Sequence, residues 1–277
     1  MSERRSIRRT LELSRTVAFP ILGGVLVLLW HDAPRHYALV NGAAFLLGML
    51  AIHFCRAPLT IANLRMVSVA VLVVLALPVL TGPEVDGVTR WLPLGPLALN
   101  SGLLTVPLLA LTASRDKNLG WAFLAAALLI VSMQPDAATA FAVTGALGVS
   151  AWTQRQWWGL LFATAGLIVG SFLFQLPSPP SFPFVEYLIP MLWQEMGVPI
   201  QAVGLGVLLL APVFYLLRSK HGSPPQRQAL IVVYLAFLGS SFVGPYPVPL
   251  AGYGASSILG FMIALAYLSE PSRSVDD

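Results

Sequence analysis

The stretch from residue 17 to residue 30 reads VAFPILGGVLVLLW and contains no charged side chain. A basic segment, residues 1–16, precedes it and carries five arginines. This order is that of a secretory signal peptide, but Trp30-His31-Asp32 stand where a cleavage site requires small residues. We therefore expect residues 17–30 to form an uncleaved first membrane span.

Nine further apolar stretches follow along the chain, near residues 37–55, 66–82, 97–113, 119–133, 137–152, 157–174, 185–217, 228–244 and 253–268. Hydrophobic residues make up 57% of the chain and charged residues only 10%, and the mean hydropathy is +0.78. A soluble domain carries about a quarter charged residues. A membrane-spanning helix needs roughly 20 apolar residues. The pattern predicts an all-α polytopic membrane protein with about ten transmembrane helices and excludes a separate soluble domain.

The distribution of basic residues orients this topology. With the N-terminus in the cytoplasm, only Arg35 and Arg90 fall outside, and 14 of the 16 basic residues fall inside: Arg4, Arg5, Arg8, Arg9, Arg15, Arg56, Arg65, Arg115, Lys117, Arg155, Arg218, Lys220, Arg227 and Arg273. Cytoplasmic loops are enriched in Lys and Arg. We expect a cytoplasmic segment (1–16), one transmembrane domain (17–270) with outer loops near 81–97 and 175–197, and a cytoplasmic tail (271–277).

One apolar stretch is too long for a single crossing. Residues 185–217 would form a helix of roughly 50 Å, and Pro190 and Pro199 should break or kink it. We expect residues 198–217 to span the membrane and residues 184–197 to form an interfacial or re-entrant piece on the outer face.

Other functions are excluded by what the sequence lacks. The single cysteine, Cys55, rules out an intramolecular disulfide, and the four histidines show no metal-ligand spacing. The pI near 9.5 reflects the basic residues of the cytoplasmic loops. Nucleic-acid binding is not predicted, because the sequence contains no basic stripe with interleaved aromatic residues.

The informative charged residues fall on the outer side: Glu84, Asp86, Arg90, Asp136, Glu186 and Glu195. Ionisable groups near a bilayer are costly and suggest a functional site. Simpler readings stay open. Asp136 is a good N-cap for the helix that follows it, and Arg90 with Trp91 has the composition of an interfacial anchor. Glu186 or Glu195 would also be explained by exposure to water.

Four segments resemble the SEDS (shape, elongation, division and sporulation) family of bacterial cell-wall proteins, the RodA/FtsW type. Residues 87–95, GVTRWLPLG, are similar to its G-x-x-R-W-I-x-L-G, and residues 134–140, QPDAATA, to its Q-P-D-L-G-T-A. Residues 248–257, VPLAGYGASS, are similar to L-P-L-I-S-Y-G-G-S-S. EYLI at 186–189 with QEMG at 194–197 is similar to D-F-I-F followed by E-E-L-G.

The resemblance implies a peptidoglycan glycosyltransferase in the bacterial cytoplasmic (inner) membrane. Such proteins polymerise a lipid-linked disaccharide precursor on the outer face, commonly with a partner transpeptidase (a penicillin-binding protein). The reaction requires a carboxylate base and positive charge, from the protein or a divalent cation, at the pyrophosphate. By position, Glu186 replaces the family's catalytic aspartate, and Arg90 is the pyrophosphate or structural partner. The other implied substrate-binding residues are Trp91, Asp136, Glu195 and Tyr253.

This sequence also departs from the family pattern. The family's P-S-E-x-x-K is replaced by Asn100-Ser101-Gly102-Leu103-Leu104-Thr105, so its acid and its base are both absent, and the chain is shorter than typical members. Two hypotheses follow: an active glycosyltransferase, and a non-catalytic scaffold or regulator that binds a wall synthase or the precursor. A lipid-linked sugar flippase ranks third, because the spans contain few polar residues.

Overall fold

The computed structural model describes residues 3–55, 60–95, 97–177, 179–186 and 188–268. Arg56, Tyr187, Arg273 and the expected tail 271–277 lie outside these residues. The helices along the chain are α1 (Glu3–Trp30), α2 (Arg35–Phe54), α3 (Ile61–Thr81), α4 (Ser101–Ala113), α5 (Gly120–Ser132), α6 (Ala137–Gln154), α7 (Trp157–Leu173), α8 (Leu188–Pro190), α9 (Pro199–Leu209), α10 (Ala211–Arg218), α11 (Pro224–Val243) and α12 (Ala255–Ala266).

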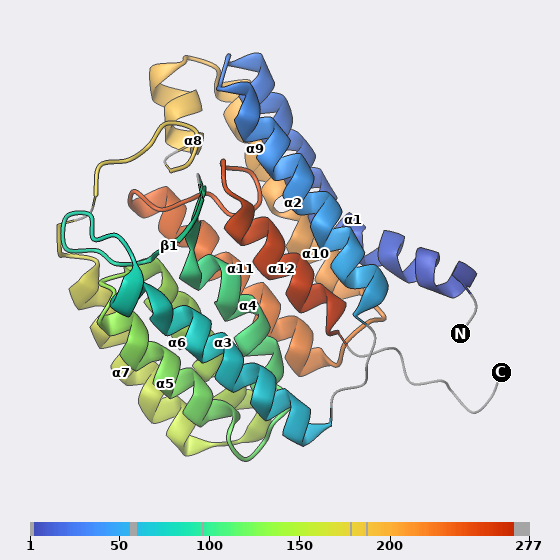
Figure 1. Ribbon diagram of the computed structural model, residues 1–277, viewed down its shortest axis with the longest axis vertical. Coiled ribbons are helices and arrows are strands. Elements are labelled where there is room, and N and C mark those ends of the chain that lie inside the picture. Colours follow the sequence, from blue (N-terminus) through green and yellow to red (C-terminus); the bar gives the residue numbers. More distant parts are fainter. Residues whose placement is uncertain (1–2, 56–59, 96, 178, 187, 269–277) are drawn as a thin grey trace.

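Helix α4 lies in the middle of the bundle (Figure 1), and nearly every residue from Ser101 to Ala113 is buried. It packs against α3, α11 and α12. The remaining helices form outer layers, with α1 and α2 against α12 on one side and α5, α6 and α7 on the other. A helix of 13 residues is about 20 Å long, shorter than a bilayer core. It therefore depends on its neighbours for an apolar environment.

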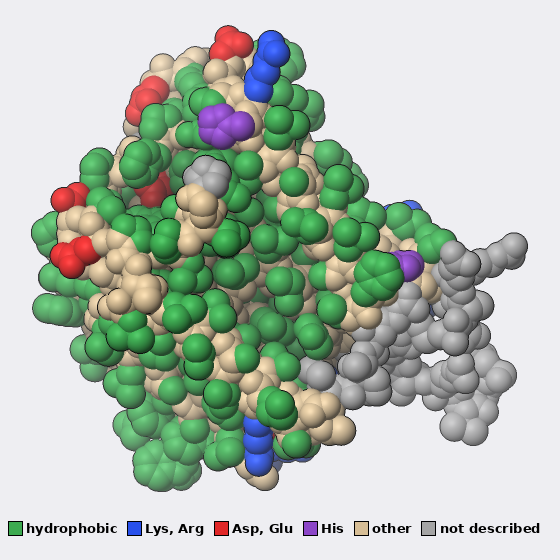
Figure 2. All heavy atoms as spheres, viewed as in Figure 1, with side chains coloured by type: hydrophobic (Ala, Val, Ile, Leu, Met, Phe, Trp, Pro, Cys, Tyr) green, Lys and Arg blue, Asp and Glu red, His purple; other side chains and the backbone are tan. Residues whose placement is uncertain are grey.

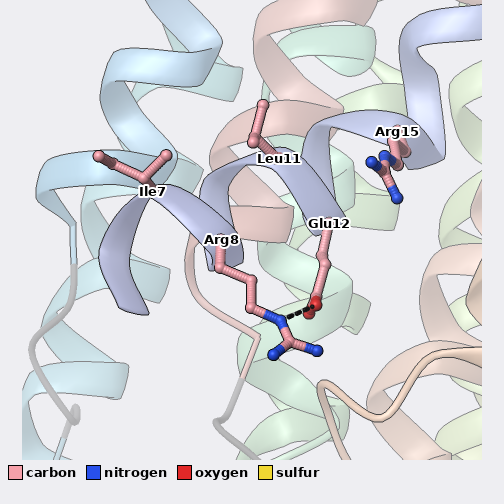
Figure 3. A pocket seen from close by; sticks show the side chains of 5 residues that line it. All are labelled: Ile7, Arg8, Leu11, Glu12 and Arg15. Atoms are coloured by element: carbon pink, nitrogen blue, oxygen red, sulfur yellow. Dashed lines mark hydrogen bonds and ion pairs between the residues drawn. The ribbon is translucent and has the colours of Figure 1, made fainter. Parts of the chain in front are cut away.

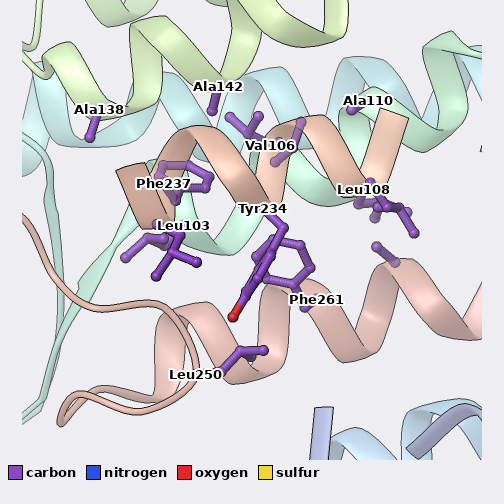
Figure 4. Close-up of a cluster of buried hydrophobic side chains, with 14 of the residues drawn as sticks. Leu103, Val106, Leu108, Ala110, Ala138, Ala142, Tyr234, Phe237, Leu250 and Phe261 are labelled. Carbon is purple, nitrogen blue, oxygen red and sulfur yellow. The ribbon is translucent and has the colours of Figure 1, made fainter. Parts of the chain in front are cut away.

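The core around α4 consists of closely packed hydrophobic side chains (Figure 4). Tyr234 of α11 is fully buried, and its hydroxyl donates a hydrogen bond to the Leu209 carbonyl at 2.7 Å. Its ring meets that of Phe261 edge to face, with centroids 5.4 Å apart. Helices α4 and α12 approach so closely at Gly260 that a Cβ atom there would lie 2.1 Å from the Leu103 carbonyl oxygen. Small residues permit such contacts between membrane helices.

The loop between α3 and α4 contains a β-hairpin that the sequence analysis did not predict. Strand β1 (Trp91–Leu94) pairs antiparallel with β2 (Leu97–Asn100), and Trp91 is opposite Asn100. The first four residues of the apolar stretch 97–113 therefore form a strand and not the start of a helix. Helix α4 begins only after Asn100, whose side chain caps it by accepting a hydrogen bond from the Leu103 amide at 2.8 Å.

The stretch 185–217 is broken before Pro199, as expected, whereas Pro190 does not interrupt the helical run from Leu188 to Glu195. Helix α8 leads into a single π-helical turn, Met191–Glu195 (η1), and α9 begins at Pro199. The expected span 198–217 consists of α9 and α10, which meet at Leu210. Pro212 in the first turn of α10 explains the interruption, since it provides no amide hydrogen for a continuous helix.

The exterior of the bundle is apolar. Leu80 and Ile200, on two helices distant in sequence, are 81% and 87% exposed, and hydrophobic side chains cover most of the face in Figure 2. Among the described residues, five helices are long and apolar enough to cross a membrane: Ser6–Trp30, Arg35–Phe54, Ile61–Thr81, Pro199–Arg218 and Pro224–Val243. The chain is a multi-pass membrane protein; the ten-span count and the location of its ends stay predictions.

Candidate functional site

Arg90 is fixed by the backbone on either side of it. Its carbonyl oxygen accepts a hydrogen bond from the Ser101 amide at 2.9 Å, and the Thr89 amide donates to the Gln134 carbonyl at 3.4 Å. The Gln134 side chain in turn donates to the Leu75 carbonyl of α3. The end of α3, the hairpin and the turn before α6 are thereby joined. Arg90 points inward from this junction and is only 2% exposed.

The Arg90 guanidinium lies between two buried carboxylates. Its Nη2 is 3.0 Å from Oε1 of Glu186, and its Nη1 is 3.7 Å from Oδ1 of Asp136. The Trp91 and Tyr246 rings lie 4.9 and 5.5 Å from the guanidinium carbon. Asp136 and Glu186 are 1% and 5% exposed. Arg90, Asp136 and Glu186 thus form one cluster, here called the Arg90 cluster, although successive members are 46 and 50 positions apart in the sequence.

Asp136 is both a helix cap and a member of the cluster. Its carboxylate accepts hydrogen bonds from the Thr139 amide at 3.3 Å and the Thr139 hydroxyl at 2.7 Å, which fix the start of α6. Its ion pair with Arg90 is additional. The capping interpretation is therefore right, and it does not exclude a second role.

Glu186 is held by a loop that pairs with the segment before α12. The Val248 amide donates to the Val185 carbonyl at 3.2 Å and the Tyr253 amide to the Phe184 carbonyl at 2.7 Å. Oε2 of Glu186 accepts from the Phe182 amide at 3.3 Å. Burial raises the pKa of the Glu186 carboxyl, and the nearby Arg90 guanidinium opposes this shift only in part. A carboxylate with a raised pKa is suited to accept a proton near neutral pH.

A small cavity of about 70 Å³ opens beside Glu186, lined also by Trp91, Asn100 and Tyr253. A larger one of about 230 Å³ shares Trp91 and Tyr253 with it and reaches Tyr37. The Tyr37 and Tyr253 rings are stacked, with centroids 3.7 Å apart and planes within 7°. Stacked aromatic faces beside a carboxylate form a surface suited to a sugar ring.

Positions that carry charge in the SEDS family are closed here. A Cβ atom on Gly102 would lie 2.0 Å from Oγ1 of Thr139, the same hydroxyl that binds Asp136. Thr105 is buried, and its hydroxyl donates to the Ser101 carbonyl at 2.6 Å. The missing acid and base are thus replaced by close packing against α6 and by a hydrogen bond within α4.

The candidate residues therefore divide into two groups. Trp91 and Tyr253 line both cavities, and Glu186 lines the smaller one. Glu195 is exposed at the end of η1, and no hydrogen bond or ion pair links it to the Arg90 cluster within the described part of the chain. The prediction that Glu195 lines or braces the same cavity therefore finds no contact to support it, because this side chain is exposed at the end of the π-helical turn.

Sequence reasoning missed several residues around the site. Asn41 of α2 is fully buried; its Nδ2 donates to the Gly252 carbonyl and its Oδ1 accepts from the Gly254 amide, both at 3.1 Å. A lone amide in an apolar stretch was the available signal. For Tyr37 and Tyr246, the sequence contains no signal of a role in the site beyond their aromatic side chains. Across the described residues, no group of three or more His, Cys, Asp or Glu side chains is placed to hold a metal ion.

No known family model matches the sequence, and no curated protein matches it. Solved structures do match. The rod shape-determining protein RodA of Thermus thermophilus aligns over 92% of this chain and 93% of its own, with 21% identity and a TM-score of 0.60. An aspartate-to-alanine mutant of that protein gives a TM-score of 0.63 with the same identity. A chain from a peptidoglycan synthase complex, described as coordinating polymerization and crosslinking, gives 0.56 over 91% of this chain. The chain therefore has the RodA fold, and the SEDS resemblance is confirmed at the level of structure.

Proposed function

We propose that this protein is a SEDS-type glycosyltransferase that polymerises a lipid-linked disaccharide precursor on the outer face of a bacterial cytoplasmic membrane. The proposal includes ten spans with both ends in the cytoplasm. The observation that carries it is the buried Glu186 carboxylate beside a cavity and paired with Arg90, within a RodA fold. Three of the four motif segments each supply one residue of the Arg90 cluster. Arg90 comes from residues 87–95, Asp136 from residues 134–140 and Glu186 from residues 186–189.

Glu186 would act as the general base. In the reaction the acceptor hydroxyl loses its proton to the carboxylate, its oxygen bonds to the anomeric carbon of the donor sugar, and the bond from that carbon to the lipid pyrophosphate breaks. Arg90 and the Phe182 amide each bind one oxygen of Glu186, so the carboxylate has a fixed orientation. Holding a base within hydrogen-bond reach of its proton is worth several orders of magnitude in rate.

Arg90 is better suited to position the base than to bind pyrophosphate. It is buried and engages two carboxylates, and its Nε has no hydrogen-bond partner in the described structure. In this proposal Arg90 is a positioning residue, and Trp91 and Tyr253 contact the sugars. A partner transpeptidase is proposed by analogy with the peptidoglycan synthase complex, one chain of which shares this fold.

A second candidate is a non-catalytic scaffold that binds the precursor or a wall synthase. Gly102 and Thr105 favour it, because they stand where the family carries a carboxylate and a lysine. A side chain at position 102 would require Thr139 to move, and Thr105 is an uncharged residue hydrogen-bonded to the Ser101 carbonyl. Both candidates use the same cavity, so binding of the precursor alone does not separate them.

Purified protein, alone and with a candidate transpeptidase, should be supplied with the lipid-linked precursor. Polymer that is lost in Glu186→Ala and retained in Glu84→Ala supports catalysis. Glu84 is a matched control, since it is an exposed glutamate in the outer loop next to the hairpin. Precursor binding without polymer under any pairing would reject the enzyme and support the scaffold.

A further inference from the structure

Another hollow, of about 400 Å³, lies at the end of the bundle opposite the Arg90 cluster. It is open to the surface and is lined by α1 between residues 8 and 16 and by the end of α10 with the loop that follows. Four basic side chains line it together with one carboxylate and one imidazole: Arg8, Arg15, Arg218, Lys220, Glu12 and His221. A neighbouring hollow of about 420 Å³ shares Arg8, Glu12 and Arg15 and adds two apolar side chains (Figure 3).

The single carboxylate of this cavity is already engaged. Glu12 Oε1 is 2.8 Å from Nε of Arg8, and Glu12 Oε2 is 3.1 Å from Nε2 of His221. Within the described part of the chain, no carboxylate lies within 4.0 Å of Arg15, Arg218 or Lys220. Three cations on two elements distant in sequence therefore face one hollow without a counter-charge, and they raise the local concentration of anions.

An apolar surface continues from this basic pocket along the same two helices. The Phe19 ring of α1 stacks on the Tyr215 ring of α10, with centroids 6.0 Å apart and planes within 14°. Leu22 and Phe214 beside them are more than half exposed. In Figure 3, Ile7 and Leu11 project from one side of α1, and Arg8, Glu12 and Arg15 from the other. The basic pocket adjoins the apolar surface at Tyr215, which lines the pocket and stacks on Phe19, an arrangement typical of a membrane interface.

We propose that the pocket binds the phosphate of an anionic membrane lipid, with the acyl chains lying against Phe19 and Tyr215. Arginine suits this ligand because its planar fork matches phosphate oxygens. The adjoining apolar surface selects a lipid over a soluble phosphate. The site is separate from the Arg90 cluster and does not depend on the reaction catalysed there.

The test uses the full-length protein and native mass spectrometry. Lipid retention should be compared for phosphatidylglycerol and phosphatidylcholine in the wild type, in R15Q/R218Q, and in a matched control, K117Q/R155Q. The control removes two exposed cations from loops at the same end of the bundle, outside the pocket. Loss of one charge-assisted hydrogen bond to a phosphate weakens binding roughly ten-fold. We expect R15Q/R218Q to weaken phosphatidylglycerol retention at least about ten-fold and the control, which makes no such bond, to change it less than three-fold.

Two further arms complete the experiment. Glu12→Gln leaves Arg8 unpaired at the pocket and should strengthen phosphatidylglycerol retention. Inorganic phosphate alone should bind far more weakly than the lipid. Equal losses in the two double variants would show diffuse surface attraction and overturn the site. Phosphate binding as tight as that of the lipid, with the same dependence on Arg15 and Arg218, would overturn the lipid assignment.

Discussion

Replacing Arg90 with methionine should strongly destabilise the fold, because methionine fills similar space and leaves two buried carboxylates without a cation. Removing one partner of a buried ion pair costs about 3–5 kcal/mol. Asp136 keeps two hydrogen bonds from Thr139, whereas Glu186 keeps only the Phe182 amide at 3.3 Å. Most of the loss should therefore arise at Glu186, and R90M/E186Q should recover a large part of it.

The comparison that isolates burial is Arg8→Met. Arg8 is 2.8 Å from Glu12, closer than Arg90 is to Glu186, but its side chain is 82% exposed. Exposed pairs four residues apart on a helix contribute about 0.3–0.5 kcal/mol. We therefore expect R90M to lose more stability than R8M, although the Arg8–Glu12 distance is the shorter of the two.

The assay is unfolding in mixed micelles of increasing SDS content, followed by tryptophan fluorescence, for the wild type, R90M, R90M/E186Q and R8M. Arg90→Lys serves as a milder variant where R90M is too unstable to purify, and its loss should be intermediate. The R90M defect should also shrink at low pH, since a proton on Glu186 removes the unpaired charge. A loss of stability in R90M no larger than that in R8M, or a double variant less stable than R90M, would show that Arg90 does not neutralise a buried charge on Glu186.

Three further predictions concern the surroundings of the site. Gly102→Glu, which restores the family's carboxylate, should destabilise the protein by about 1–3 kcal/mol or more through the clash with Thr139, measured in the same micelles; unchanged stability would contradict the close packing. Asn41→Ala should cost about 1–3 kcal/mol by leaving two backbone groups before α12 unsatisfied, seen as faster hydrogen exchange at Gly254. Burial raises the pKa of Glu186 above the usual glutamate value of about 4.5, and a general base must be ionised to act. In a pH–rate profile, polymer formation should therefore fall off on the acidic side at a pH above about 4.5. A fall-off at or below that pH would argue against Glu186 as the base.

The helices were largely predictable because hydrocarbon imposes a simple rule on a spanning segment. The apolar stretches 119–133 and 157–174 match α5 and α7 to within one residue at each end. The β-hairpin was not predictable from the same signal, since Trp91–Leu94 and Leu97–Asn100 are as apolar as the spans. The break at Pro199 was predictable, but the turn at Leu210 was not recognised.

The site was predictable in part. Motif resemblance identified Arg90, Asp136 and Glu186, but only the folded chain shows that they meet. Thr139 lay within a quoted motif, yet its contact with Gly102 depends on the packing of α4 on α6. Glu195 was grouped with them by charge and side of the membrane, and neither feature fixes the direction of a side chain at the end of a short helical turn.

As the general base, Glu186 must remove the acceptor proton beside the cavity that it lines with Trp91 and Tyr253. Polymer formation from lipid-linked precursor in vesicles should be compared for the wild type and for Glu186→Gln, which keeps the shape of the side chain and removes its basicity. We expect the variant to fold, to bind the precursor and to make no polymer. Polymer formed by Glu186→Gln at the wild-type rate would contradict the role of Glu186 as the base.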